Sequence, residues 1–144
     1  MEKKNGYFFI FMIVVLIFFA NCSSKIKAKP SQDSLTATEA LRVIEEVRYA
    51  YENKKEKILK EHMTIILSSR VLQELNFDKA ILNYSIQLVT LKNKKVYVKC
   101  NWESDVTIGS SQYSDEGSAV FVLKGMPLKI IDIEGTNPLR IPQI

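Results

Sequence analysis

An apolar run near the N-terminus constrains most strongly what this chain can become. Residues 8–20 (FFIFMIVVLIFFA) form an unbroken apolar stretch of 13 residues, preceded by a polar start that contains Lys3 and Lys4. As a helix the run would be about 20 Å long, whereas the hydrocarbon core of a bilayer is about 30 Å thick. A short apolar run behind lysines is typical of a secretory signal peptide, with an uncleaved N-terminal anchor as the alternative.

The residues that end this run resemble the lipobox of bacterial lipoproteins. In Phe19-Ala20-Asn21-Cys22, Cys22 matches the invariant position and Ala20 a position that is usually small. Asn21 and Phe19 depart from the usual Gly or Ala and the usual Leu, and relaxed boxes of this kind are similar to those of spirochaetes. The resemblance implies that residues 1–21 are a signal peptide cut between Asn21 and Cys22. It also implies that the sulfur of Cys22 carries a diacylglyceryl group with fatty acyl chains such as palmitate.

The resemblance makes the membrane a partner of this chain through lipid on Cys22. Residues 22–33 are expected to be the lipidated cysteine and a flexible tether, because they are polar, contain Pro30 and lack hydrophobic periodicity. Lys25, Lys27 and Lys29 could contact anionic head groups, although solvated linker charges are the favoured interpretation. Ser23 is not the Asp that retains many lipoproteins in the inner membrane, which implies an outer-membrane location in the cell envelope.

The charge distribution argues against nucleic-acid binding. The 144 residues carry a formal net charge of +4, from 20 basic and 16 acidic residues. Five of the basic residues and two of the acidic ones precede position 34. Residues 34–144 therefore hold 15 basic and 14 acidic residues, a net charge of +1. A nucleic-acid binder would carry its basic excess on the folded domain. Residues 34–144 are expected to form one domain large enough to fold without disulfides or a metal.

Helix signals follow the tether directly. Thr36 and Glu39 have the spacing of a capping box, and an apolar stripe then recurs every three or four residues to about Asn53. The stripe consists of Leu41, Ile44, Val47 and Tyr51. A second helix is expected over 54–67, with Ile58, Leu59, Met63 and Ile66 facing inward. Ser68 or Ser69 is expected to cap a short third helix through Val71, Leu72 and Leu75.

From Asn83 onward the pattern changes to alternation. Val96, Val98, Cys100 and Trp102 alternate with polar residues and predict a half-buried strand. Strands are also expected over 85–91, 112–124 (with a bulge at Gly117) and 128–134, joined by turns at 92–95, 109–111 and 125–127. The sequence therefore predicts an α+β fold, with three N-terminal helices packed on a curved four-stranded antiparallel meander sheet.

Residues 37–138 resemble the nuclear transport factor 2-like (NTF2-like) superfamily. The resemblance is carried by the helix that ends in Tyr-Glu-Asn-Lys-Lys and by the segments VYVKCNWES, GSAVFVLKG and IIDIEGTNP. It implies a cone of curved antiparallel sheet around N-terminal helices. Many small secreted bacterial proteins and lipoproteins carry this domain.

The sequence contains no pattern of a metal, cofactor or nucleophile site. His62 is the sole histidine and is expected on a helix surface, and a lone histidine excludes multi-histidine metal sites. Cys100 shares a strand face with Val98 and Trp102, which favours a buried, inert thiol over a nucleophile. The few glycines form no phosphate-binding loop. No cofactor and no metal are expected.

Two functions remain open. Ketosteroid isomerase and other enzymes of the superfamily place Asp, His or Tyr inside the cone, so the resemblance offers candidates for an isomerase, dehydratase or hydrolase acting on a small hydrophobic substrate. These candidates are Asp78, Tyr84, Asp105 and Asp132, although Asp132 alternates away from Ile131 and Ile133 and is expected to be exposed.

Non-catalytic binding is the favoured function. A pocket lined by Tyr51, Trp102 and Phe121 would suit an apolar small ligand, with core packing as the alternative role of these residues. The outer sheet face with Tyr97, Lys99 and Asn101 could instead bind an envelope protein, with ordinary solvated strand residues as the alternative.

Overall fold

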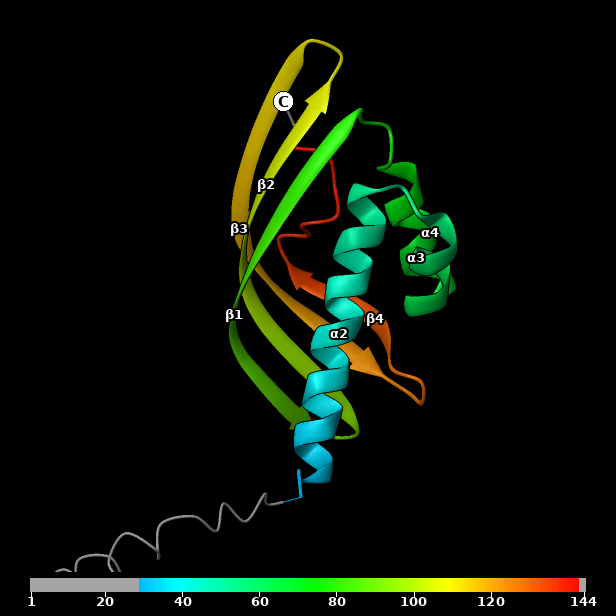
Figure 1. Ribbon diagram of the computed structural model, residues 1–144, viewed down its shortest axis with the longest axis vertical. Helices are drawn as coiled ribbons and strands as arrows, with labels where there is room; N and C mark the ends of the chain where they lie inside the picture. Colours follow the sequence, from blue (N-terminus) through cyan, green and yellow to red (C-terminus); the bar gives the residue numbers. More distant parts are fainter. Residues whose placement is uncertain (1–28, 143–144) are drawn as a thin grey trace, which may run out of the picture. The chain divides into compact units, whose positions relative to one another are not determined.

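The computed structural model describes residues 29–142, so the predicted signal peptide, the lipobox and Cys22 lie outside the described residues. Ser31–Ile144 forms one compact unit. Its elements follow one another along the chain as Figure 1 labels them. They are α2 (Gln32–Glu52), α3 (Glu56–His62), α4 (Ile65–Gln73), β1 (Lys79–Lys92), β2 (Lys95–Ile108), β3 (Ser111–Lys124) and β4 (Lys129–Gly135). The buried core cluster extends from Ala40 to Leu139, so the residues that hold the fold together all lie within this unit.

Helix α2 (Gln32–Glu52) begins four residues before the predicted capping box. Its N-cap is Ser31, whose Oγ accepts a hydrogen bond from the Ser34 amide at 3.1 Å. Thr36 lies inside the helix and donates to the Gln32 carbonyl, so the predicted capping box is wrong and the helix starts within the predicted tether. Ser31 and Thr36 both satisfy the chemistry of a cap, and the earlier cap adds a turn of helix.

The buried stripe of α2 differs from the predicted one at a single position. Ile44, Val47 and Tyr51 are buried as predicted, whereas Leu41 is 36% exposed. The buried face is completed by Ala40, Val43 and Ala50. Leu41 therefore lies at the edge of the buried face.

The predicted second helix is broken in two. Helices α3 (Glu56–His62) and α4 (Ile65–Gln73) are separated by Met63 and Thr64. Met63 forms an isolated bridge with Ile130 of β4, and the Thr64 amide donates to the Ile130 carbonyl at 3.1 Å. A strand contact therefore replaces helical hydrogen bonds at this point.

The break also changes the residues that face inward. Ile66 is 70% exposed rather than inward, while Leu59 and Met63 are buried as predicted. Ser68 and Ser69 lie within α4, whose N-cap is Thr64, so the predicted serine cap is wrong. The hydroxyl of Ser68 donates to the Ile65 carbonyl at 3.1 Å inside the helix instead.

The four strands form an antiparallel sheet of order β1-β2-β3-β4, which confirms the predicted meander. They are β1 (Lys79–Lys92), β2 (Lys95–Ile108), β3 (Ser111–Lys124) and β4 (Lys129–Gly135). The first strand begins six residues earlier than predicted. Asn93 and Lys94 form the first turn with φ values of 53° and 59°, the left-handed conformation that a type I′ hairpin turn requires at both central residues.

Gly117 is not a bulge, because β2 and β3 pair without a register shift along their whole length. It lies opposite Trp102, and a Cβ built on it would stand 3.0 Å from the indole ring. The glycine therefore leaves room for the Trp102 side chain. The sheet is irregular instead between Ile86 and Leu88 of β1 and between Val122 and Leu123 of β3.

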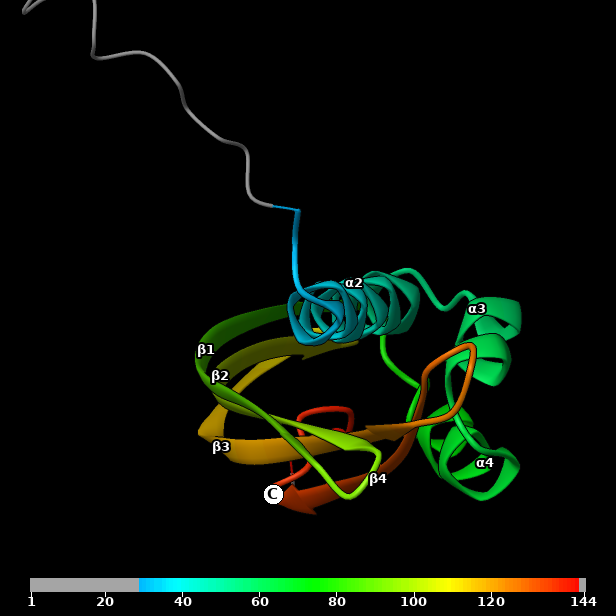
Figure 2. The same ribbon diagram turned by 90° about the horizontal axis from the view of Figure 1, so that it is seen from below.

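The curved sheet encloses the core together with the helices. Seen along α2, β1 lies beside this helix and the sheet curls round to β4 near α4 (Figure 2). After Gly135 the chain turns back toward the enclosed side, where Leu139 is fully buried. On the free edge of β1, Glu52 Oε1 accepts from the Leu82 amide at 2.7 Å and Arg48 Nη1 donates to the Leu82 carbonyl at 3.2 Å. Helix α2 thus satisfies an edge-strand peptide that would otherwise be unpaired.

Candidate functional site

The inner sheet face, which would hold the active site of a cone-fold enzyme, is covered by aromatic side chains. Tyr84 packs edge-on against Phe121 with ring centroids 5.5 Å apart, and Tyr51 packs against Phe77 at 5.1 Å. Trp102 donates its indole Nε1–H to the Thr136 carbonyl at 3.0 Å. These contacts are made within the chain itself.

The three residues predicted to line an apolar pocket all lie in this core. Tyr51 and Phe121 have no exposed surface and Trp102 is 3% exposed. Trp102 lines one of four hollows on the described surface, whereas Tyr51 and Phe121 line none of the four. The arrangement fits the core-packing role that the sequence left open for these side chains.

Two phenol groups in the core are unusual. The hydroxyls of Tyr51 and Tyr84 are inaccessible and have no hydrogen-bond partner among the described residues. Burial raises the pKa of both tyrosines above the ordinary value, mainly because the interior disfavours the charged phenolate. Both groups are therefore neutral phenols at neutral pH.

The structure does not bring the predicted carboxylate candidates together. Asp78 precedes β1 and accepts a hydrogen bond from the Gly109 amide at 2.6 Å. Asp105 accepts from the Ser114 hydroxyl on the outer sheet face, and Asp132 accepts from the Ile133 amide at 2.9 Å. All three side chains are exposed, as predicted for Asp132. Within residues 29–142 the buried polar residues are Ser68 and Ser104, so no described carboxylate lies in the core.

Cys100 and His62 both have structural surroundings. Cys100 is fully buried between Val98 and Trp102 on the inner face, as the alternation predicted, and burial raises the pKa of its thiol. His62 ends α3 and lies 2.6 Å from Glu46 of α2, measured from Nε2 to Oε2. It is half-buried rather than on an open helix surface, and it links the two helices. No group of three or more His, Cys, Asp or Glu residues within 29–142 is placed to hold a metal ion.

The outer sheet face carries a polar hollow of about 540 Å³ across β1, β2 and β3. Each strand contributes two polar side chains, and the set consists of Asn83, Ser85, Asn101, Glu103, Glu116 and Ser118. Ser118 donates to Asn101 Oδ1 at 2.7 Å, which orients the amide at the centre of the hollow. A neighbouring hollow shares Glu103 and Glu116 and adds Asp105. The arrangement offers several hydrogen-bond acceptors and negative charges to solvent.

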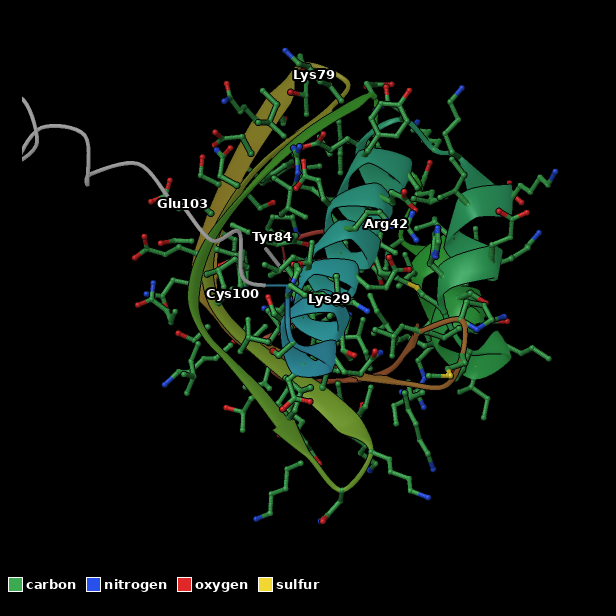
Figure 3. The ribbon with its side chains drawn as sticks, turned by 60° about the horizontal axis from the view of Figure 1, so that its bottom comes forward. Lys29, Arg42, Lys79, Tyr84, Cys100 and Glu103 are labelled. Carbon is green, nitrogen blue, oxygen red and sulfur yellow. The ribbon has the colours of Figure 1, made fainter. Side chains whose placement is uncertain are left out.

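Of the residues that line this hollow, the sequence identified Tyr84, Trp102 and Asn101 as candidates, but of these only Asn101 was assigned to the outer face. Alternation along β2 is enough to place Asn101 and Glu103 on the outer face. The neighbouring residues on β1 and β3 depend on strand register. Asn101 is paired with Ser85 on one side and Ser118 on the other, and Glu103 is paired with Asn83 and with Glu116. Figure 3 shows Tyr84 and Cys100 on the side of the sheet that faces α2, and Glu103 on the opposite side.

None of the helices within residues 29–142 has the length and apolar character needed to cross a membrane. No protein-family model and no curated protein sequence matches the chain. Among solved structures, the fold is similar to that of a nuclear transport factor 2 (NTF2-like) superfamily protein from Salmonella enterica subsp. enterica serovar Typhimurium str. LT2, with a TM-score of 0.64. The two sequences are 11% identical, and the match covers 74% of this chain and 93% of that one. The domain described here therefore has the NTF2-like fold.

Proposed function

We propose that this chain is a lipid-anchored protein of the cell envelope whose NTF2-like domain binds a partner protein on the outer sheet face and catalyses no reaction. The observation that carries the binding role is the contrast between the two faces of the sheet. The inner face is covered by core side chains, whereas the outer face carries an open polar hollow.

The anchor is proposed from the N-terminal sequence. Residues 8–20 are too short to span a bilayer comfortably, and their last two residues begin the lipobox-like Phe19-Ala20-Asn21-Cys22. A single acyl chain gives marginal membrane binding, whereas two or more hold a protein firmly. The two or three chains that lipoproteins carry would suffice, and Ser23 after the cysteine favours the outer membrane.

Replacing Cys22 with serine is expected either to release the protein from the membrane pellet into the soluble fraction or to leave it as an uncleaved precursor without the lipid. The reason is that the hydroxyl of serine does not accept the diacylglyceryl group that precedes cleavage. Cell fractionation and intact-mass measurement of full-length wild type, Cys22→Ser and Cys100→Ser would check this. The anchor proposal is wrong if native protein retains Met1 or carries an unmodified Cys22. Cys100→Ser should stay in the pellet.

The alternative is an isomerase, dehydratase or hydrolase that uses a pocket Asp or Tyr. Such an enzyme needs a general base or acid with a pKa near the working pH inside a desolvated site. Asp78, Asp105 and Asp132 are exposed, and the raised pKa of Tyr84 keeps it protonated. These features favour binding over catalysis.

The chemistry of the outer hollow favours a protein partner over an apolar small molecule. Glu103 and Glu116 supply negative charge, and Asn83 and Asn101 supply amides that both donate and accept. Ile81 and Leu88 of β1 lie on the same face and expose apolar surface beside the polar groups. Polar anchors next to exposed apolar side chains are typical of a protein interface.

A photoreactive amino acid at Asn101 is expected to give a discrete cross-linked product in cells that make the full-length protein. The matched control places the same group at Lys57, which is exposed on α3 and distant from the sheet face. A partner that fits this acidic hollow carries positive charge. The double change Glu103→Lys/Glu116→Lys should therefore reduce the Asn101 product at least about tenfold, because like charges across an interface cost several kcal/mol. Equal products from positions 101 and 57, or an Asn101 product unaffected by the charge reversal, would contradict the proposal.

A further inference from the structure

Lysines gather at the end of the domain where α2 begins. Lys92, Lys94 and Lys95 come from the turn between β1 and β2, and Lys124 comes from the end of β3. Together they line one hollow, in which Asp33 of α2 is the single acidic residue. Figure 1 shows the first turn of α2 and the β1–β2 turn at the same end of the domain. We call these four lysines and the turns that carry them the basic end.

The positive charge at the basic end is not neutralised within the domain. None of the four lysines forms an ion pair with a carboxylate of residues 29–142. By contrast, Lys57 and Lys60 on α3 each pair with a glutamate one turn away. The ammonium groups of the basic end are therefore available to an external anion.

Apolar side chains accompany these lysines. Met126, in the turn between β3 and β4, is 95% exposed, and Leu35 and Leu91 also expose apolar surface. A second hollow on the α2 side of this turn shares Met126 and Leu128 with the first, so apolar surface continues across the turn. Long basic side chains around exposed apolar groups match the boundary between lipid head groups and acyl chains.

Charge changes sign along the outer sheet face. Among the outward positions of β2, the charged side chains are Lys95 and Lys99 in the first half of the strand and Glu103 and Asp105 in the second half. Glu116 of β3 is paired with Glu103 and adds negative charge, and we call Glu103, Asp105 and Glu116 the acidic end. Lys79 is the single lysine among the β1 residues that pair with this part of β2. A surface with negative charge would attract the basic end and repel the acidic end, and this would orient the domain.

The position of the proposed anchor fits that orientation. Helix α2 starts at Gln32, ten positions after Cys22, and ten residues span at most about 35 Å. The start of α2 and the basic end share one hollow, so a tether of this length to lipid on Cys22 would keep this end within reach of the membrane. Glu103 and Asp105 lie eight and ten positions along β2 from Lys95, which is about 26–33 Å of strand.

We propose that the basic end is a second membrane-contact surface that binds the head groups of anionic phospholipids. The lysines contact head-group phosphates, and Met126 enters the boundary with the acyl chains. The domain then stands with its acidic outer hollow directed away from the membrane. The inference rests on the proposed lipid anchor for its place beside a membrane, but its chemistry is independent of Cys22.

The test uses the fragment Ser31–Ile144, which retains the whole core and the N-cap of α2 and lacks Cys22. In sedimentation with vesicles at low salt, it should bind phosphatidylcholine vesicles that contain 30% phosphatidylglycerol and not pure phosphatidylcholine vesicles. The variant Lys92→Gln/Lys94→Gln/Lys124→Gln should bind roughly a hundredfold more weakly, because each surface lysine contributes roughly fivefold to the partition coefficient. High salt should also release the wild-type fragment.

The matched control is Lys55→Gln/Lys57→Gln/Lys79→Gln, which removes the same charge from exposed positions away from the basic end. It should lose less than about threefold in binding. The inference is overturned if both triple variants weaken equally, if both vesicle types bind equally, or if free glycerol phosphate at the same head-group concentration displaces the protein. Because the fragment has no Cys22, these outcomes are separate from the fractionation of Cys22→Ser, which tests the anchor.

Discussion

Replacing Phe121 with alanine is expected to lower the free energy of unfolding by about 3–5 kcal/mol. The ring is fully buried, faces inward from β3 and packs edge-on against Tyr84. Its removal deletes apolar contacts and leaves a cavity that the surrounding strands close only in part. Urea denaturation of Ser31–Ile144 followed by circular dichroism would measure the loss.

The matched control for Phe121→Ala is Val120→Ala, which removes a half-buried side chain from the next position of β3. Val120 points to the outer face, so a loss of at most about 1 kcal/mol is expected. The experiment also decides between the two roles that the sequence left open for Phe121. A loss below about 1.5 kcal/mol would mean that the ring borders open space, as the pocket prediction requires.

Replacing Gly135 with alanine is expected to cost about 2–4 kcal/mol, the second large effect. Gly135 ends β4 with φ of 83°, and a Cβ there would stand 2.7 Å from the Ser118 carbonyl oxygen. The left-handed backbone costs an L-residue about 1–2 kcal/mol, and the close contact adds about 1–2 kcal/mol. The Ser118 oxygen also accepts from the Thr136 amide, so moving it away would weaken that hydrogen bond.

Gly109→Ala is the control for this substitution. Gly109 also has a positive φ, of 59°, but a Cβ there would have no atom within 4 Å. Only the cost of the left-handed backbone applies, so the free energy of unfolding should fall by about 1 kcal/mol. Equal losses at Gly109 and Gly135 would show that the contact with Ser118 is not tight. Thermal or urea unfolding of both variants gives the comparison.

The parts of the fold that local chemistry controls could be predicted from the sequence. The inward positions of β2 follow from alternation alone, since successive side chains of a strand point to opposite faces. The turn at Asn93 and Lys94 follows from its short polar sequence between two alternating runs. The helical period of Ile44, Val47 and Tyr51 identified the buried face of α2.

The errors arose where a distant residue decides the local structure. Residues 54–67 have an acceptable helical pattern, but Ile130 takes the Thr64 amide and divides the segment into α3 and α4. A glycine within a strand suggests a bulge, but Gly117 is in regular register and leaves room for the side chain of Trp102 on the paired strand. Neither Ile130 nor Trp102 is a neighbour of the affected residue in the sequence.

The sequence by itself determined the element types, the strand order of the meander and the inner face of the central strand, because these depend on periodicity and on short turns. Only the tertiary structure decided that Tyr51, Trp102 and Phe121 share one core and that Asp78, Asp105 and Asp132 stay exposed and apart. It also brought the lysines of two turns beside the start of α2. The physical reason is that burial and charge proximity depend on register and on long-range packing, which local patterns do not encode.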